Sequence, residues 1–170
     1  MATLVEIVPY DPSWPRHFSG AEAALRELLG STVLTIDHVG STAIVGMPAK
    51  PIIDIDVTLS SLTAVPDAGA CLVEAGYEPR GNRYDDDVWA FMLKSAVPQL
   101  RVYLCPPLNR THAHRLTFRD HLRRHEDAAK AYAELKRQLA VRHPYDGDRY
   151  TEAKSEFILK IIDRALSQAS

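Results

Sequence analysis

Residues 38–57 read HVGSTAIVGMPAKPIIDIDV, and this stretch decides the fold. An apolar run stops at Gly40-Ser41, and a second apolar run then carries Asp54 and Asp56 one residue apart. Side chains of a β-strand alternate between its two faces, so both carboxylates are expected to leave the same face. Like charges at neighbouring positions of one face repel unless a positive group lies between them. The stretch therefore predicts a cation beside the two aspartates.

Magnesium is the cation that this pattern favours. Proteins usually hold Mg²⁺ with one or two carboxylates, water and the phosphates of a substrate. The backbone N–H groups of a Gly-Ser turn can cradle those phosphates. A second interpretation stays open, because Asp-Ile-Asp also suits the solvent face of an antiparallel strand and Gly-Ser is a common turn dipeptide.

Several sequence blocks along the chain match one family. They are residues 5–15 (VEIVPYDPSWP), 38–43 (HVGSTA), 50–55 (KPIIDI) and 116–123 (LTFRDHLR), with Leu135-Lys136 and Lys154. On these blocks the chain resembles the GrpB family (UPF0157), small bacterial proteins of the polymerase-β-like nucleotidyltransferase superfamily. The resemblance covers nearly the whole chain. It implies the superfamily's fold and a nucleotide-type site at Gly40, Ser41, Asp54 and Asp56, but it names no substrate.

The chain departs from the family pattern and the superfamily pattern at two places. Val45 stands where the family usually has proline. Active nucleotidyltransferases carry a third carboxylate on a later strand, and the strand expected over 99–104 has Arg101 there, where GrpB relatives commonly have histidine. A two-metal mechanism would lose a ligand without that acid. Arg101 is instead a candidate for direct contact with a phosphate.

One strongly basic block lies in the second half of the chain. Residues 110–125 contain five arginines and four histidines against one acid, Asp120. Arg115, Arg119 and Arg123 recur every four residues and so share one stripe of a predicted helix. Arginine suits bidentate contact with phosphate, although such side chains more commonly pair with acids or stay hydrated.

The remaining candidates for the site are weaker. Lys50 joins Arg119 and Arg123 as a candidate for neutralising phosphate charge, and Thr42 belongs to the Gly-Ser turn. His38 precedes the turn and is a candidate for orienting the site, although a histidine at a strand end more often has a structural role. Lys136 and Lys154 are candidates for contact with a ligand, although exposed helix lysines, as which they are interpreted, usually have no such specific role.

Length and composition predict one globular domain over residues 1–170. The hydrophobic content of 46% and charged content of 25% exclude a disordered chain. A net charge of −2 gives no general attraction to nucleic acid or anionic membranes. Two cysteines form no disulfide framework, and no leader or membrane-spanning run is recognised, so a cytoplasmic protein is expected.

The predicted fold class is α/β (α+β), with a small mixed sheet flanked by helices and a helical C-terminal half. A turn is expected at Gly81-Asn82. The predicted strands are 33–39, 52–59, 77–79, 88–93 and 100–104, and the predicted helices are 14–29, 62–75, 110–125, 128–142 and 151–167.

Two functions follow as hypotheses. The first is transfer of a nucleotidyl group from a nucleoside triphosphate to an unidentified acceptor, with Mg²⁺ on Asp54 and Asp56 and the phosphates on Gly40 and Ser41. The alternative is a non-catalytic module that binds a nucleotide or phosphometabolite beside a partner enzyme, as relatives fused behind a dephospho-coenzyme A kinase suggest. The missing third carboxylate and Arg101 favour the alternative. A third hypothesis, contact of residues 110–124 with RNA or DNA, is opposed by the few aromatics there and by the net charge.

Overall fold

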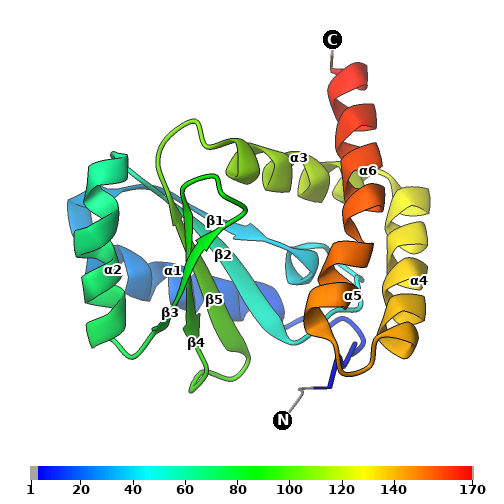
Figure 1. Ribbon diagram of the computed structural model, residues 1–170, viewed down its shortest axis with the longest axis horizontal. Helices are drawn as coiled ribbons and strands as arrows, with labels where there is room; N and C mark the ends of the chain where they lie inside the picture. The colour runs from blue at the N-terminus through cyan, green and yellow to red at the C-terminus, as the bar shows by residue number, and fades with distance from the viewer. Residues whose placement is uncertain (1–3, 170) are drawn as a thin grey trace.

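The computed structural model describes residues 4–169, which form a five-stranded sheet with helices on both faces (Figure 1). The strand order is β1-β2-β5-β4-β3; β2 and β5 are parallel, and all other neighbouring strands are antiparallel. The predicted mixed sheet is therefore confirmed. The strands are β1 (Val33–Val39), β2 (Ile52–Leu59), β3 (Glu78–Arg83), β4 (Val88–Leu93) and β5 (Gln99–Cys105).

Strand β2 separates an apolar face of the sheet from a polar one. Ile53, Ile55 and Val57 have no exposed surface and pack against α1 (Trp14–Leu29) and α2 (Val65–Glu74). Asp54 and Asp56 lie at the intervening positions and leave the opposite face, as the alternation predicts.

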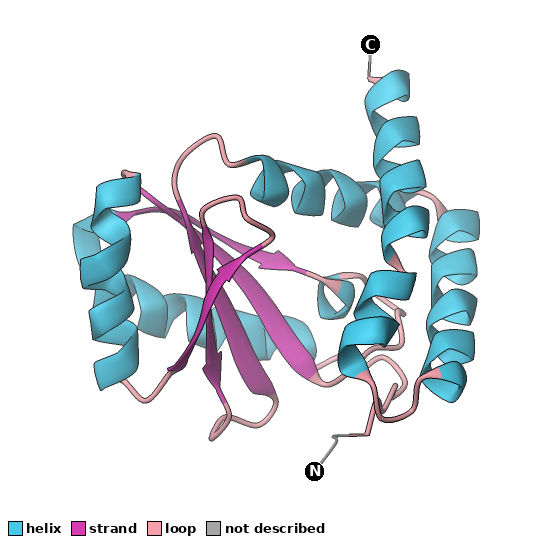
Figure 2. Cartoon of the chain, viewed as in Figure 1, coloured by secondary structure: helices cyan, strands magenta, loops and turns pink. Residues whose placement is uncertain are grey.

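The C-terminal half is helical and lies beside the sheet (Figure 2). Ile44 and Met47, from the loop between β1 and β2, are buried in a second apolar cluster with Leu122, Tyr132 and Ile161 of these helices. That cluster fixes the loop between the sheet and the helices. The helices are α3 (Arg110–Arg124), α4 (Glu126–Arg142), α5 (Gly147–Ala153) and α6 (Ser155–Gln168), and the short 3₁₀ helices are η1 (Gly30–Thr32), η2 (Ser41–Ala43) and η3 (Leu62–Ala64).

The turn expected at Gly81-Asn82 is wrong, because β3 runs through both residues. A bulge between Pro79 and Gly81 lets the strand continue, with Gly81 at φ +79°. The chain reverses at 84–87 instead. There the Asp86 carboxylate accepts hydrogen bonds from the backbone N–H and the hydroxyl of Thr111 at 2.9 and 2.6 Å. These bonds attach the hairpin to the first turn of α3.

The expectations for the cysteines agree with the structure. Cys71 and Cys105 are both free thiols, and Cys105, the last residue of β5, is buried. Within residues 4–169, no helix combines the length and the apolar character needed to cross a lipid bilayer.

Candidate functional site

The Gly40 turn brings the end of β1 against the carboxylate of Asp54. Gly40 has φ +72°, and a Cβ atom there would lie 2.6 Å from Asp54 Oδ2. Only glycine combines that backbone conformation with so close an approach. The turn and the aspartate strand, which the sequence associated by their spacing, are therefore in direct contact.

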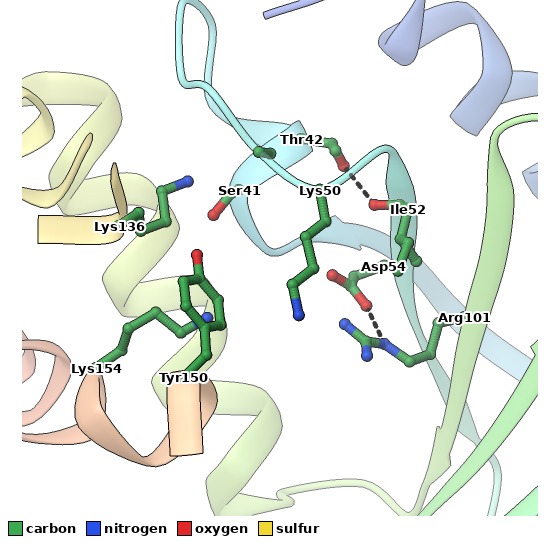
Figure 3. A pocket seen from close by; sticks show the side chains of 10 residues that line it. Ser41, Thr42, Lys50, Ile52, Asp54, Arg101, Lys136, Tyr150 and Lys154 are labelled. Carbon is green, nitrogen blue, oxygen red and sulfur yellow. Dashed lines mark hydrogen bonds and ion pairs between the residues drawn. The ribbon is translucent and has the colours of Figure 1, made fainter. Parts of the chain in front are cut away.

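A basic pocket opens beside this turn (Figure 3). Its volume is about 60 Å³, and it lies where the β1–β2 loop, β2, β5, α4 and α5 meet. Hydroxyl groups of Ser41, Thr42 and Tyr150 contribute to its wall. Four cationic side chains face one acid in the lining, which contains Lys50, Lys136, Lys154, Arg101 and Asp54. The pocket therefore has an excess of positive charge.

Lys136 is the most deeply buried of these cations. Its side chain is 1% exposed, and its Nζ donates a hydrogen bond to the carbonyl of Pro48. Burial, with Lys154 and Arg137 nearby, lowers the pKa of Lys136 to about 7. The ring of Tyr132 lies 4.9 Å from the ammonium group.

Lys50 and Lys154 approach the ring of Tyr150 at 4.6 and 4.3 Å, respectively. Burial is the main cause that lowers the pKa of Lys154 to about 8, and the charge of Lys50 adds to it. Burial and the charge of Arg101 likewise lower the pKa of Lys50. Removal of these ammonium groups from water is thus the main cause of both shifts.

Asp54 is paired with Arg101, its register partner on the parallel strand β5. Arg101 Nε donates to Asp54 Oδ1 at 2.6 Å, and the charge of Asp54 raises the pKa of the guanidinium. The structure shows no hydrogen bond from either Nη atom of Arg101 to residues 4–169.

Asp56 lies outside the pocket, buried beneath α3 with 1% of its surface exposed. Its Oδ1 accepts a bond from Arg115 Nη1 at 2.5 Å, and its Oδ2 lies 2.9 Å from His112 Nδ1. The other ring nitrogen of His112 is 3.4 Å from Asp37 Oδ2. Both oxygens of Asp56 are thus engaged by α3.

This donor set does not fit a magnesium ion. Arg101 binds one oxygen of Asp54, Gly40 crowds the other, and α3 binds both oxygens of Asp56. In the described part of the chain, no three His, Cys, Asp or Glu side chains converge in a way that could hold a metal. Magnesium stays a prediction of the sequence that this arrangement does not support.

Arg119 and Arg123 hold the backbone of the turn rather than facing the basic pocket. Arg119 Nη1 donates to the carbonyl of His38 at 3.0 Å, while Nε and Nη2 of Arg123 donate to the carbonyl of Ala43 at 2.9 and 2.7 Å. The arginine stripe of α3 does face β2, because Arg115 of the same stripe binds the carboxylate of Asp56.

His38, Arg119 and Arg123 line a second cavity of about 350 Å³ between α1 and α3. The ring of His38 stacks on Phe18 at 4.8 Å, and its Nε2 lies 2.9 Å from Thr42 Oγ1. Burial lowers the pKa of His38 to about 4, so the ring is neutral at pH 7. Thr42 lines both cavities. The predicted site residues are therefore divided: Ser41, Thr42, Lys50, Asp54 and Arg101 share the basic pocket, and Gly40 lies at its edge.

The sequence interpretation of Lys136 and Lys154 as exposed was wrong. Lys136 is buried and Lys154 is half-buried, because α4 and α5 close over the β1–β2 loop. A signal was present for Lys136, since Tyr132, Lys136 and Leu139 recur at the spacing of one buried helix face. Tyr150 was not predicted as a site residue. It lies in α5, one turn before Lys154, and Lys154 lies at the break between α5 and α6.

Sequence comparison identifies a family over almost the whole chain. The family described as GrpB protein matches residues 4–164. A UPF0157 protein of Pseudomonas aeruginosa is 38% identical, over 96% of this chain and 68% of its own length. This chain covers 45% of a Bacillus subtilis UPF0157 protein that is 34% identical, and 46% of a Mycolicibacterium paratuberculosis protein named dephospho-CoA kinase that is 32% identical.

Solved structures agree with the sequence relatives. The crystal structure of the conserved protein GrpB from Enterococcus faecalis superposes with a TM-score of 0.87 at 30% identity, over 96% of this chain and 99% of that one. The Cid1 poly(U) polymerase superposes with a TM-score of 0.54 at 17% identity, over 80% of this chain and 43% of that one. The second likeness shows that the chain has the nucleotidyltransferase fold.

Proposed function

This chain belongs to the GrpB family, and from that membership and the basic pocket we propose that it binds a small phosphorylated ligand, a nucleotide or a phosphometabolite. The observation that carries the proposal is the set of four cations around one acid in a small, partly enclosed pocket. Ammonium groups are costly to bury without a counter-charge. A bound phosphate would supply that charge.

The chemistry of the lining suits a phosphate. Lysine ammonium groups act as strongly hydrated point charges, and a guanidinium makes directional, paired hydrogen bonds to oxyanions. Lys50 and Lys154 lie on either side of Tyr150, whereas Arg101 approaches from β5 (Figure 3). An oxyanion in the pocket would therefore meet donors from several elements at once.

The size of the pocket limits what it can enclose. A volume of about 60 Å³ holds a few water molecules or one phosphoryl group. Pockets that enclose a whole drug-sized ligand measure roughly 300–1,000 Å³. We therefore assign the basic pocket to the phosphate end of the ligand.

Binding is favoured over nucleotidyl transfer for a specific reason. Transfer by the superfamily's chemistry depends on metal-bound carboxylates, and here arginines and a histidine bind those carboxylates. The fold shared with Cid1 does not by itself carry the activity. Similarity to a protein named dephospho-CoA kinase supports the idea that the module acts beside a partner enzyme.

Calorimetric titration of the purified full chain would test the proposal. The ligands are inorganic phosphate, AMP and ATP, first without a divalent cation and then with Mg²⁺, with pyrophosphate release followed in parallel. We expect binding without pyrophosphate release. Absence of binding for all three ligands would contradict the proposal, and pyrophosphate release that Asp54→Asn abolishes would favour transfer instead.

Two variants give this titration a matched control. The double variant Lys50→Met, Lys154→Met should weaken phosphate binding at least a hundredfold, since a hydrogen bond to a charged group contributes roughly 1.5–3 kcal/mol. Lys160→Met on α6 should change nothing, because the Lys160 side chain is 72% exposed and forms an ion pair with Glu156 on the same helix.

A further inference from the structure

Arg101 and Asp54 lie side by side in the lining of the basic pocket (Figure 3). Arg101 Nε donates to Asp54 Oδ1 at 2.6 Å. A guanidinium has five N–H donors, and Asp54 engages only the one on Nε. The remaining donors, on the two Nη atoms, make no hydrogen bond to residues 4–169 and are left for a ligand.

The surroundings of Asp54 leave little space for a metal. Gly40 approaches so closely that even an added Cβ would lie 2.6 Å from Asp54 Oδ2. Arg101 covers the other oxygen, and the Asp54 side chain is 17% exposed. The glycine turn thus borders one oxygen of this carboxylate, and a guanidinium binds the other.

The second aspartate is neutralised in the same manner. Asp56 is bound by Arg115 at 2.5 Å and by an imidazole nitrogen of His112 at 2.9 Å. Two acids on one face of a strand require positive groups between them. In this chain, side chains of β5 and α3 provide those groups.

We propose that Arg101 occupies the place that a metal ion takes between a carboxylate and a phosphate, so that the pocket binds its anion without a divalent cation. The proposal rests on the proposed function, because it concerns the same pocket. Asp54 orients the guanidinium through Nε, and the Nη atoms contact the phosphate. Asp54 is then a positioning residue, and Arg101 is a binding residue. A lysine cannot replace Arg101, since it lacks the planar fork that contacts a carboxylate and a phosphate together.

Counting bound manganese is the first test, because Mn²⁺ can replace Mg²⁺ in oxygen-ligand sites and its free form gives an electron paramagnetic resonance signal. We expect no stoichiometric Mn²⁺ on the wild-type chain, with or without phosphate. One Mn²⁺ per chain that Asp54→Asn removes would overturn the proposal. The count on the wild-type chain needs no phosphate to bind, so bound Mn²⁺ would overturn the proposal even if the proposed function fails.

The second test is phosphate titration in excess chelator and in excess Mg²⁺. We expect the wild-type affinity to agree within about twofold between the two conditions. Arg101→Met should weaken binding about tenfold or more in both, and Arg101→Lys should not restore it. Arg80→Met is the matched control, because Arg80 is an exposed arginine on β3 that pairs with Glu78 of the same strand. Loss of wild-type binding in chelator would overturn the proposal.

Discussion

Replacement of Lys136 by methionine should make the free energy of unfolding less dependent on pH. The side chain of Lys136 is 1% exposed, and burial lowers its pKa from 10.5 to about 7. Between these two values the unfolded chain binds more protons than the folded chain. Stability therefore rises with pH across this window, because the unfolded chain progressively loses a proton that the folded chain no longer binds.

The size of the effect follows from the two pKa values. From pH 7 to pH 9, the linkage relation gives a gain of about 2 kcal/mol from Lys136 alone. Methionine has a similar length and no charge, so the variant should lack that gain. At pH 7 the variant avoids the cost of the ammonium group but leaves the Pro48 carbonyl without its donor, which costs roughly 1–3 kcal/mol.

Urea unfolding of both proteins at pH 7, 8 and 9 measures this directly. Subtracting the free energies of unfolding of the two proteins at each pH removes the contributions of Lys154, Cys105 and the tyrosines, which are common to both chains. We expect the wild-type chain to gain about 2 kcal/mol relative to the variant over this range. If the free energy of unfolding changed equally with pH in both proteins, the reasoning would be refuted, because Lys136 would then have the same pKa in the folded and unfolded chains.

Three further predictions concern the site. Gly40→Ala should lower the free energy of unfolding by about 1–3 kcal/mol in urea titrations, because its Cβ would meet Asp54 in a left-handed backbone conformation. Arg115→Met should cost about 3–5 kcal/mol in the same assay, since it leaves a buried Asp56 without its arginine, whereas Arg110→Met, at an exposed position, should cost little. Phosphate binding at pH 8 should take up about one proton, because the anion raises the lowered pKa of the pocket lysines. Calorimetry in buffers of different ionisation enthalpy measures this proton uptake, and a binding enthalpy that is independent of the buffer would argue against it.

The Gly40 turn and the two strands around it were predictable from local patterns. Alternation along 52–59 placed Asp54 and Asp56 opposite the buried isoleucines, and the structure confirms this. Backbone alternation and the need for glycine at a left-handed position are properties of a few adjacent residues. These local constraints are therefore present in the folded protein, because any tertiary structure must accommodate them.

The partners of these residues were not predictable in the same way. Arg101 was expected to meet a phosphate, and the structure pairs it with Asp54, because β5 joins the sheet parallel to β2. Arg119 and Arg123 were expected near a ligand, yet they hold backbone carbonyls of the turn. Such pairings depend on strand order and on how a helix docks, neither of which a periodic pattern specifies.

The amino-acid sequence alone therefore determined most of the helices and strands, the glycine turn, the shared face of the two acids and the family. Only the tertiary structure decided that these acids are neutralised by the chain's own side chains and that Lys136 lies in the interior. The physical reason is that these contacts join residues far apart in the sequence, such as Arg123 and Ala43 or Lys136 and Pro48, 80 and 88 positions apart, which meet only after the helices close over the sheet.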